Sequence, residues 1–286
     1  IISNNLLSVA VNQKGAELAS IRTATQEYLW EADAQYWGRH SAILFPIVGR
    51  LQNNQYELGG KHDEMGQHGF ARDLFFEVLQ HSETELKLAL KSNETTLRQY
   101  PYQFELQAHY KIFSDTVAIT YTVINTDNQT IHFSIGGHPA FKCPLSDEEQ
   151  RSDYYLLFNQ VEQADRQLIN ENGLRTGMKK KILNGDNRIR ITDDLFDQDA
   201  LVFEGLNSDK VTLMNGDHQK VLTFEFENFP YLGIWSKNQA SPFVCLEPWH
   251  GVADHTSTSG NFLEKEGIVK LEQDEQFTCT HKVKIW

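Results

Sequence analysis

Apolar and polar residues alternate along much of this chain with the period of two that is typical of half-buried β-strands. Three consecutive runs with short polar connections predict an antiparallel meander. The period-2 pattern recurs almost from end to end, so we predict an all-β protein. The clearest runs cover residues 86–90, 104–112, 117–123, 131–135, 221–226 and 277–285, and the meander is expected over 104–135.

Helical periodicity is weak by comparison. Trp30–Arg39 and Ser146–Ser152 each predict at most a turn or two of helix, because neither sustains an apolar stripe over three turns. No Gly/Ser-rich or Pro-rich linker, low-complexity tract or repeat marks a domain boundary. Although 286 residues are long enough for two domains, we predict one domain over residues 1–286, a large antiparallel β-sandwich with a few short helices.

The composition excludes several classes of partner. Asp and Glu outnumber Lys and Arg by 39 to 26, giving a net charge of −13 with no basic run, so nucleic acid and membrane surfaces are not expected partners. No stretch of 18 apolar residues predicts a membrane span. Cys143, Cys245 and Cys279 are odd in number and form no CxxC pair, which argues against a disulfide framework and favours a reducing cytoplasm.

Four short segments interrupt the alternation with residues that strands do not need. Two of them hold a histidine beside glycine or proline. Gly66 and Gly69 bracket His68 and allow the backbone to approach a ligand. Pro139 lacks a donor for the sheet and holds the preceding His138 extended, where its side chain becomes available to a cleft. The plainer interpretations are an incidental loop histidine and a hydrogen-bonded core histidine.

The other two segments offer an arginine and a carboxylate. Arg50 ends the apolar run 45–49, where it could simply be an exposed residue at a strand end. Glu247 lies inside the apolar run 244–249, where partial desolvation raises the pKa of a carboxyl and makes it a usable base, unless it points outward. His138 and Glu247 together offer the two groups that paired acid and base catalysis requires.

Other catalytic classes find less support. There is no GxSxG elbow, no Gly-rich phosphate loop and no GxGxxG after a strand. A glycosidase needs two carboxylates, and only one is well placed. His62, Glu64 and His68 do not form an HExxH helix, so we expect no metal site there.

Four short motifs of the chain resemble those of a known protein family. The motifs FPIVGRL (45–51), HGFAR (68–72), GGHPAF (136–141) and LEPWHG (246–251) resemble, in order and spacing, the aldose 1-epimerase (galactose mutarotase) superfamily. With DALVF at 199–203, they are most similar to its LacX-like bacterial branch. The resemblance implies a β-supersandwich isomerase that interconverts the α- and β-anomers of an aldohexose and needs no metal or organic cofactor.

The resemblance also implies roles for individual residues. His138 would be the general acid that protonates the ring oxygen, and Glu247 the general base that takes the proton from the anomeric hydroxyl. The sugar-binding candidates are Arg50, His68, Arg72 and Asp199, with Trp235 or Phe141 as an aromatic floor.

The motifs leave the substrate open. A sister group that acts on hexose 6-phosphates shares the HGFAR form, and phosphate binding needs at least two converging basic groups. We favour a neutral aldose, with a hexose 6-phosphate or a non-catalytic role in sugar binding or sensing as alternatives. We expect a monomer or homodimer whose partner is a small-molecule sugar. The basic candidates for phosphate are Arg50, Arg72, Lys142 and Lys237.

Overall fold

Twenty-one β-strands carry almost all the regular structure of the chain, of which the computed structural model describes all residues, 1–286. Every predicted strand run falls on one or two of them, so the all-β prediction is confirmed. The strands are β1 (Ile2–Ser3), β2 (Ser8–Val11), β3 (Leu18–Arg22), β4 (Ser41–Leu44), β5 (Gln55–Leu58), β6 (Lys61–Glu64), β7 (Glu77–His81), β8 (Glu85–Lys91), β9 (Phe104–Phe113), β10 (Thr116–Asn125), β11 (Ile131–Phe133), β12 (Ile135–Lys142), β13 (Tyr155–Ile169), β14 (Arg175–Arg190), β15 (Leu201–Glu204), β16 (Lys210–Met214), β17 (Lys220–Glu225), β18 (Tyr231–Trp235), β19 (Phe243–His250), β20 (Val269–Leu271) and β21 (Gln276–Ile285).

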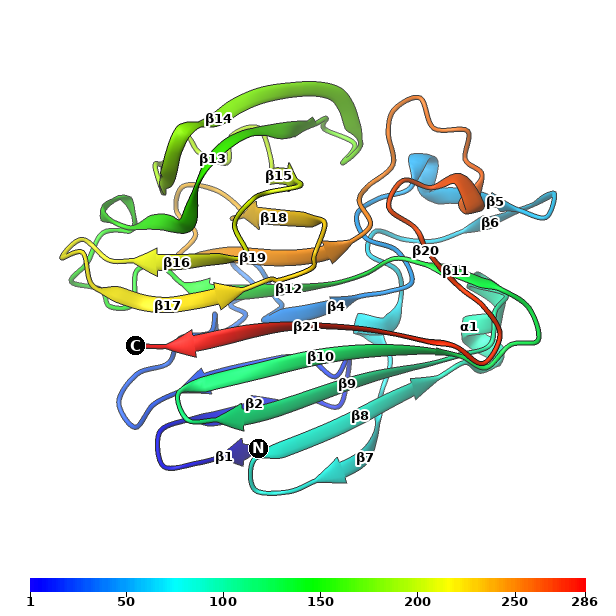
Figure 1. Cartoon of the computed structure of the whole chain (residues 1–286), viewed down its shortest axis with the longest axis horizontal. Helices are drawn as coiled ribbons and strands as arrows, with labels where there is room; N and C mark the ends of the chain where they lie inside the picture. Colours follow the sequence, from blue (N-terminus) through cyan, green and yellow to red (C-terminus); the bar gives the residue numbers. More distant parts are fainter.

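Fourteen of these strands form one antiparallel sheet, in the order β4-β12-β19-β18-β15-β13-β16-β17-β21-β10-β9-β8-β7, with β14 paired to β13. Three small sheets, β1-β2-β3, β11-β20 and β5-β6, complete the fold. The long strand β13 joins the two parts of the large sheet: its first residues pair with β16 and its end pairs with β15. Figure 1 shows the β13–β14 hairpin rising above β15 and β18 at the top of the view.

The predicted meander is only partly right. Strands β9 and β10 form a hairpin, but the other neighbour of β10 is β21, from the far end of the chain. The third predicted strand splits in two: β11 pairs with β20, and β12 lies between β4 and β19. The alternation correctly predicts where the strands lie. It does not predict which strands pair, because the pairing of distant strands leaves no local pattern in the sequence.

Helix is scarce, as predicted, but it lies elsewhere. The single α-helix, α1 (Glu94–Gln99), was not predicted, and Asn93 and Thr96 cap its first turn in a capping box. Trp30–Arg39 forms turns rather than helix, and Ala32 there has a positive φ of 57°, which is incompatible with a right-handed helix. In Ser146–Ser152 only the last two residues enter a 3₁₀ turn, η3 (Arg151–Asp153). The other 3₁₀ turns are η1 (Gln52–Asn54), η2 (Ala71–Asp73) and η4 (Phe262–Glu264). No helix is long and apolar enough to cross a bilayer.

Strands β4, β12, β19, β18 and β15 form one part of the large sheet, and the strands from β16 to β7 in the sheet order form the other. The two parts pack face to face across one core, whose residues come from the whole length of the chain, from Ile2 to Ile285. Phe141 on β12 meets Phe224 on β17 with ring centroids 6.0 Å apart. On β10, Tyr121 is buried in this core, while the alternate Thr120 points outward and bonds Thr280 on β21. The fold is thus the predicted sandwich, and the period of two separates core-facing from outward-facing residues.

The same alternation turns one set of side chains of β12, β18 and β19 away from this core. Val244 and Leu246 belong to the core, whereas Cys245, Glu247 and Trp249 face the opposite side of the strand. On that outer face a cavity of about 300 Å³ opens. This cavity is the candidate site.

Candidate active site

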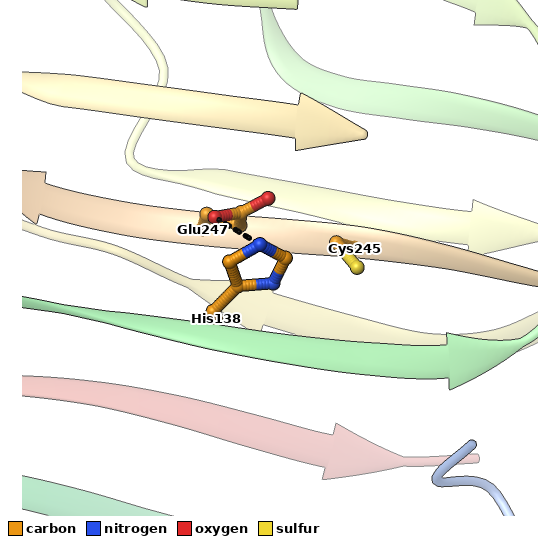
Figure 2. Close-up of side chains that lie close together, drawn as sticks. All are labelled: His138, Cys245 and Glu247. Atoms are coloured by element: carbon orange, nitrogen blue, oxygen red, sulfur yellow. Dashed lines mark ion pairs between the residues drawn. The ribbon is translucent and has the colours of Figure 1, made fainter. Parts of the chain in front are cut away.

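The strand register places His138 beside Glu247. Strands β12 and β19 pair in antiparallel register with Gly136 opposite Trp249 and Ala140 opposite Cys245. The same register, carried through Pro139, sets His138 opposite Glu247. Figure 2 shows the imidazole and the carboxylate pointing toward each other, with Nε2 of His138 3.2 Å from Oε2 of Glu247.

Both groups line the cavity but are almost buried, with side-chain exposures of 9% for His138 and 2% for Glu247. Burial lowers the pKa of His138 to about 3, and the positive charges of Arg72 and Arg39 act in the same direction. Burial and the negative charge of Asp199 raise the pKa of Glu247 well above its usual range. Both shifts favour the neutral form of each group, so a proton shared by the pair is favoured on the carboxyl of Glu247 rather than on the imidazole of His138.

Aromatic rings surround His138. Trp37 stacks on the imidazole with centroids 4.6 Å apart and an interplanar angle of 25°, and Trp235 meets it edge-on at 5.6 Å. Trp37 was missed, because its segment had been interpreted as a short helix. Phe141 was the wrong choice for an aromatic floor: it is three positions from His138 on the same strand, so it points to the opposite face and is buried in the core. Trp235 does line the cavity.

Glycines make room for Trp249 beside Glu247. A Cβ on Gly233 of β18 would collide with the indole of Trp249, and a Cβ on Gly136 of β12 would lie 2.6 Å from it. Gly233 is also the residue opposite Glu247 across the β18–β19 pair. The absence of side chains at these two positions lets the indole lie across its neighbouring strands and form part of the cavity wall.

Two loops that carry predicted motifs are bonded together at the cavity. Nδ1 of His68 accepts a hydrogen bond from the backbone N–H of Gly49 at 3.1 Å, and the backbone N–H of His68 donates to the carbonyl of Gly49 at 2.8 Å. Burial lowers the pKa of His68 well below its ordinary value, so the ring stays neutral. With Nδ1 used as an acceptor, Nε2 carries the hydrogen and is left as a donor.

The polar residues predicted for sugar binding lie at different depths. Arg72, Asp199 and Lys237 line the cavity, and Asp199 is exposed at its edge. Arg50 does not line it, but it donates to Oε1 of the lining residue Gln67 at 3.2 Å. Lys142 lies outside the cavity and pairs with Glu31 at 3.0 Å, so it is not placed for a phosphate there.

The part of the cavity wall formed by residues 252–253 rests on buried charges that the sequence did not reveal. Nε of Arg175 donates to the carbonyl of Ala253 at 2.8 Å, while its terminal nitrogens bind Glu266 at 2.6 and 2.7 Å. Nζ of Lys265 donates to Oδ1 of Asp254 and to the carbonyl of Val252, each at 2.7 Å. Arg175 itself lines the cavity, and these contacts fix the neighbouring lining segment 252–253. The partners of Arg175 lie 78 and 91 positions away, and those of Lys265 lie 11 and 13 positions away, so no local motif marks either residue.

The residues that could hold a metal are not those considered from the sequence. His62 and Glu64 lie on the exposed hairpin strand β6, outside the cavity. The group with ligand geometry is His138, Cys245 and Glu247, whose nitrogen, sulfur and oxygen atoms lie within 4.8 Å of one another. Burial raises the pKa of the Cys245 thiol well above its usual range, so without a metal it is a neutral thiol.

The sandwich defines a class of protein, those with the galactose mutarotase-like fold. A crystal structure of a galactose mutarotase related enzyme from Lactobacillus acidophilus has a TM-score of 0.94 at 32% identity and covers 100% of this chain and 96% of its own. A galactose mutarotase-like protein from Lactobacillus casei has a TM-score of 0.93 at 31% identity, covering 100% and 99%.

Sequence comparison gives the same assignment. The family model described as aldose 1-epimerase matches residues 1–270, so the chain belongs to the aldose 1-epimerase family. The chromosomal LacX protein of Lactococcus lactis is 33% identical over 284 residues, covering 94% of this chain and 93% of the relative. The predicted family resemblance, including its LacX-like form, is confirmed.

Proposed function

We propose that this protein is an aldose 1-epimerase that interconverts the α- and β-anomers of a neutral aldohexose by opening and reclosing the ring. The observation that carries the proposal is the buried His138–Glu247 pair, 3.2 Å apart at the cavity surface and outward from the core. Opening a hemiacetal needs one proton delivered and one removed, and this pair supplies one acid and one base.

The chemistry follows from the proton that the pair shares. With the sugar bound, the proton moves from Glu247 to His138, which creates the productive acid and base without changing the total charge. Glu247 takes the anomeric hydroxyl proton as His138 protonates the ring oxygen. The C1–C2 bond of the open aldehyde rotates, and closure on the other face reverses both transfers.

The surrounding residues suit a bound sugar. Trp235 and Trp37 offer apolar ring surface beside His138. The neutral His68 offers an N–H donor, Arg72 offers cationic donors, and Asp199 offers an acceptor for hydroxyls.

A hexose 6-phosphate is the second candidate substrate, because two cations at the cavity have spare capacity. Nε of Arg72 is buried without a hydrogen-bond partner, and Lys237 forms no ion pair. Asp199 is the lining carboxylate that opposes them, and the third lining cation, Arg175, is already paired with Glu266. We favour the neutral sugar, since Asp73 lies 3.8 Å from the Arg72 guanidinium and already offsets its charge.

Polarimetry separates these substrates. We expect the purified protein to speed the optical-rotation relaxation of freshly dissolved α-D-galactose or α-D-glucose, with a smaller kcat/KM for the corresponding 6-phosphates. Lys237→Ala should leave neutral sugars nearly unaffected. A larger kcat/KM for the phosphates, with a selective loss in Lys237→Ala, would support the second candidate. Sugar binding in calorimetry without faster relaxation would indicate a non-catalytic binding protein.

The pH profile tests the shared proton. The imidazole of His138 becomes protonated, giving the pair two protons, only as the pH falls toward about 3. Because the pKa of Glu247 is raised, its carboxyl keeps the single proton of the pair to a higher pH than an ordinary carboxyl would. An ordinary Glu has a pKa of 4.5 and an ordinary His a pKa of 6.5. We therefore expect kcat/KM to be flat between these two pH values. It should fall above that range, as the pair loses its last proton. A bell with limbs at 4.5 and 6.5 would contradict this assignment.

A further inference from the structure

We propose that His138, Cys245 and Glu247 form a site for a thiophilic divalent cation such as Zn²⁺, and that the bound ion inhibits the anomer conversion. The inhibition rests on the proposed function, whereas the binding does not. The three side chains lie together on two adjacent strands, with Cys245 and Glu247 two residues apart on β19 (Figure 2). Their ligand atoms lie within 4.8 Å of one another.

The donor set and its spacing fit such an ion. Zn²⁺ binds imidazole nitrogen, thiolate sulfur and carboxylate oxygen at ~2.0–2.3 Å, which puts ligand atoms of a tetrahedral site roughly 3.3–3.8 Å apart. The 3.2 Å between Nε2 of His138 and Oε2 of Glu247 is already close to this spacing. Sγ of Cys245 lies within 4.8 Å of the other two ligand atoms and supplies the third ligand by moving closer to them.

The carboxylate and the thiol are available as ligands. Oε2 of Glu247 is buried without a hydrogen-bond partner, and the residue as a whole is 1% exposed. Cys245 forms no disulfide and is buried against Trp30 and Phe243. Because His138 and Glu247 line the cavity, an ion held between them has its remaining coordination position open to water from that side.

Charges of both signs lie near the proposed site. Arg72 and Arg39 act on His138 and oppose a further positive charge, while Asp199 acts on Glu247 and favours it. A metal-bound thiol is deprotonated. On binding, the Cys245 thiol and the Glu247 carboxyl each release their proton to solvent. The resulting thiolate and carboxylate balance the two charges of the metal, leaving a neutral cluster beneath the tryptophans.

Occupation of this site blocks the proposed reaction. The metal takes up the carboxylate and imidazole that exchange the proton with the sugar, so Zn²⁺ and sugar compete for the same atoms. Mg²⁺ and Ca²⁺ prefer all-oxygen ligand sets and should have no effect at the same concentration.

Cobalt spectroscopy tests the binding directly, because a Co²⁺–thiolate bond produces a charge-transfer absorption in the near ultraviolet. We expect this band to saturate at one equivalent of Co²⁺ in the wild-type protein. The same result is expected for the matched control Cys279→Ala, which removes another buried cysteine, on β21. The band should be absent in Cys245→Ala, with Cys245→Ser as the substitute if the alanine variant does not fold. Competition with a chromophoric chelator should show at least about tenfold weaker Zn²⁺ binding in the Cys245 variant.

The activity arm uses the same proteins. Zn²⁺ should slow anomer exchange competitively with sugar in the wild type and in Cys279→Ala, and EDTA should restore it. No Co²⁺–thiolate band in the wild type, or equal Zn²⁺ affinity in Cys245→Ala, would overturn the proposal. If no sugar is turned over, the proposed function fails, yet the cobalt and chelator measurements still decide the metal site.

Discussion

Replacement of Glu247 by Gln is expected to lower kcat by about 10²–10⁴-fold, the usual contribution of one positioned acid or base. The amide keeps the size of the side chain and its place opposite His138, but it cannot accept the anomeric proton. Sugar binding should persist, because His68, Arg72 and Trp235 remain in the cavity. Single-turnover polarimetry for the rate and calorimetry for the affinity separate the two effects.

The matched control is Glu77→Gln, which changes a carboxylate on the exposed edge strand β7 and should leave kcat unchanged. His138→Asn should repeat the loss seen with Glu247→Gln. The double variant should be little worse than either single one, since the two groups act as one proton-sharing unit. A Glu247→Gln variant that keeps more than about a tenth of kcat is incompatible with a general base at this position.

Lys265→Met should reduce the free energy of unfolding by about 3–5 kcal/mol, because it leaves the buried carboxylate of Asp254 without its counter-ion. The two side chains are 3% and 5% exposed, and the ammonium also caps the carbonyl of Val252 behind the cavity wall. Urea unfolding measures the loss.

Lys270→Met provides the comparison. Lys270 pairs with Glu272 at the same distance, 2.7 Å, but the two side chains are 63% and 54% exposed. Its loss should cost less than about 1 kcal/mol, as is usual for a surface ion pair. Equal destabilisation by the two substitutions would show that the Lys265–Asp254 pair does not hold the wall.

The strands could be predicted from sequence because each one has a core face and an outer face. The alternation at 117–123 and 277–285 directly reflects the burial of every second residue of β10 and β21. The neighbours of each strand could not be predicted in this way, since β10 pairs with a strand more than 150 positions away. The meander prediction failed beyond its first hairpin for that reason.

Some residues of the candidate site could likewise be predicted from local sequence, and others could not. His138 and Glu247 stood out locally, through Pro139 and through a charge in an apolar run, and the register then set them opposite each other. Trp37 lies on an irregular turn that carries no periodic signal. Arg175 lines the cavity and bonds Ala253, 78 positions away, while Lys265 supports the wall through Asp254, 11 positions away; neither lies in a recognisable motif, so only the fold reveals them. Phe141 is an aromatic residue, as a sugar platform requires, but its side chain lies on the core face of β12 rather than on the cavity face.

Two-dimensional exchange NMR at anomeric equilibrium tests the central claim most directly, because it detects interconversion of the anomers without any net reaction. We expect α-to-β cross-peaks for an aldohexose at protein concentrations and mixing times that give none without protein. We also expect these cross-peaks to vanish in Glu247→Gln and to persist in Glu77→Gln. Cross-peaks of equal intensity in Glu247→Gln, or none in the wild type with any aldohexose, would contradict the central claim.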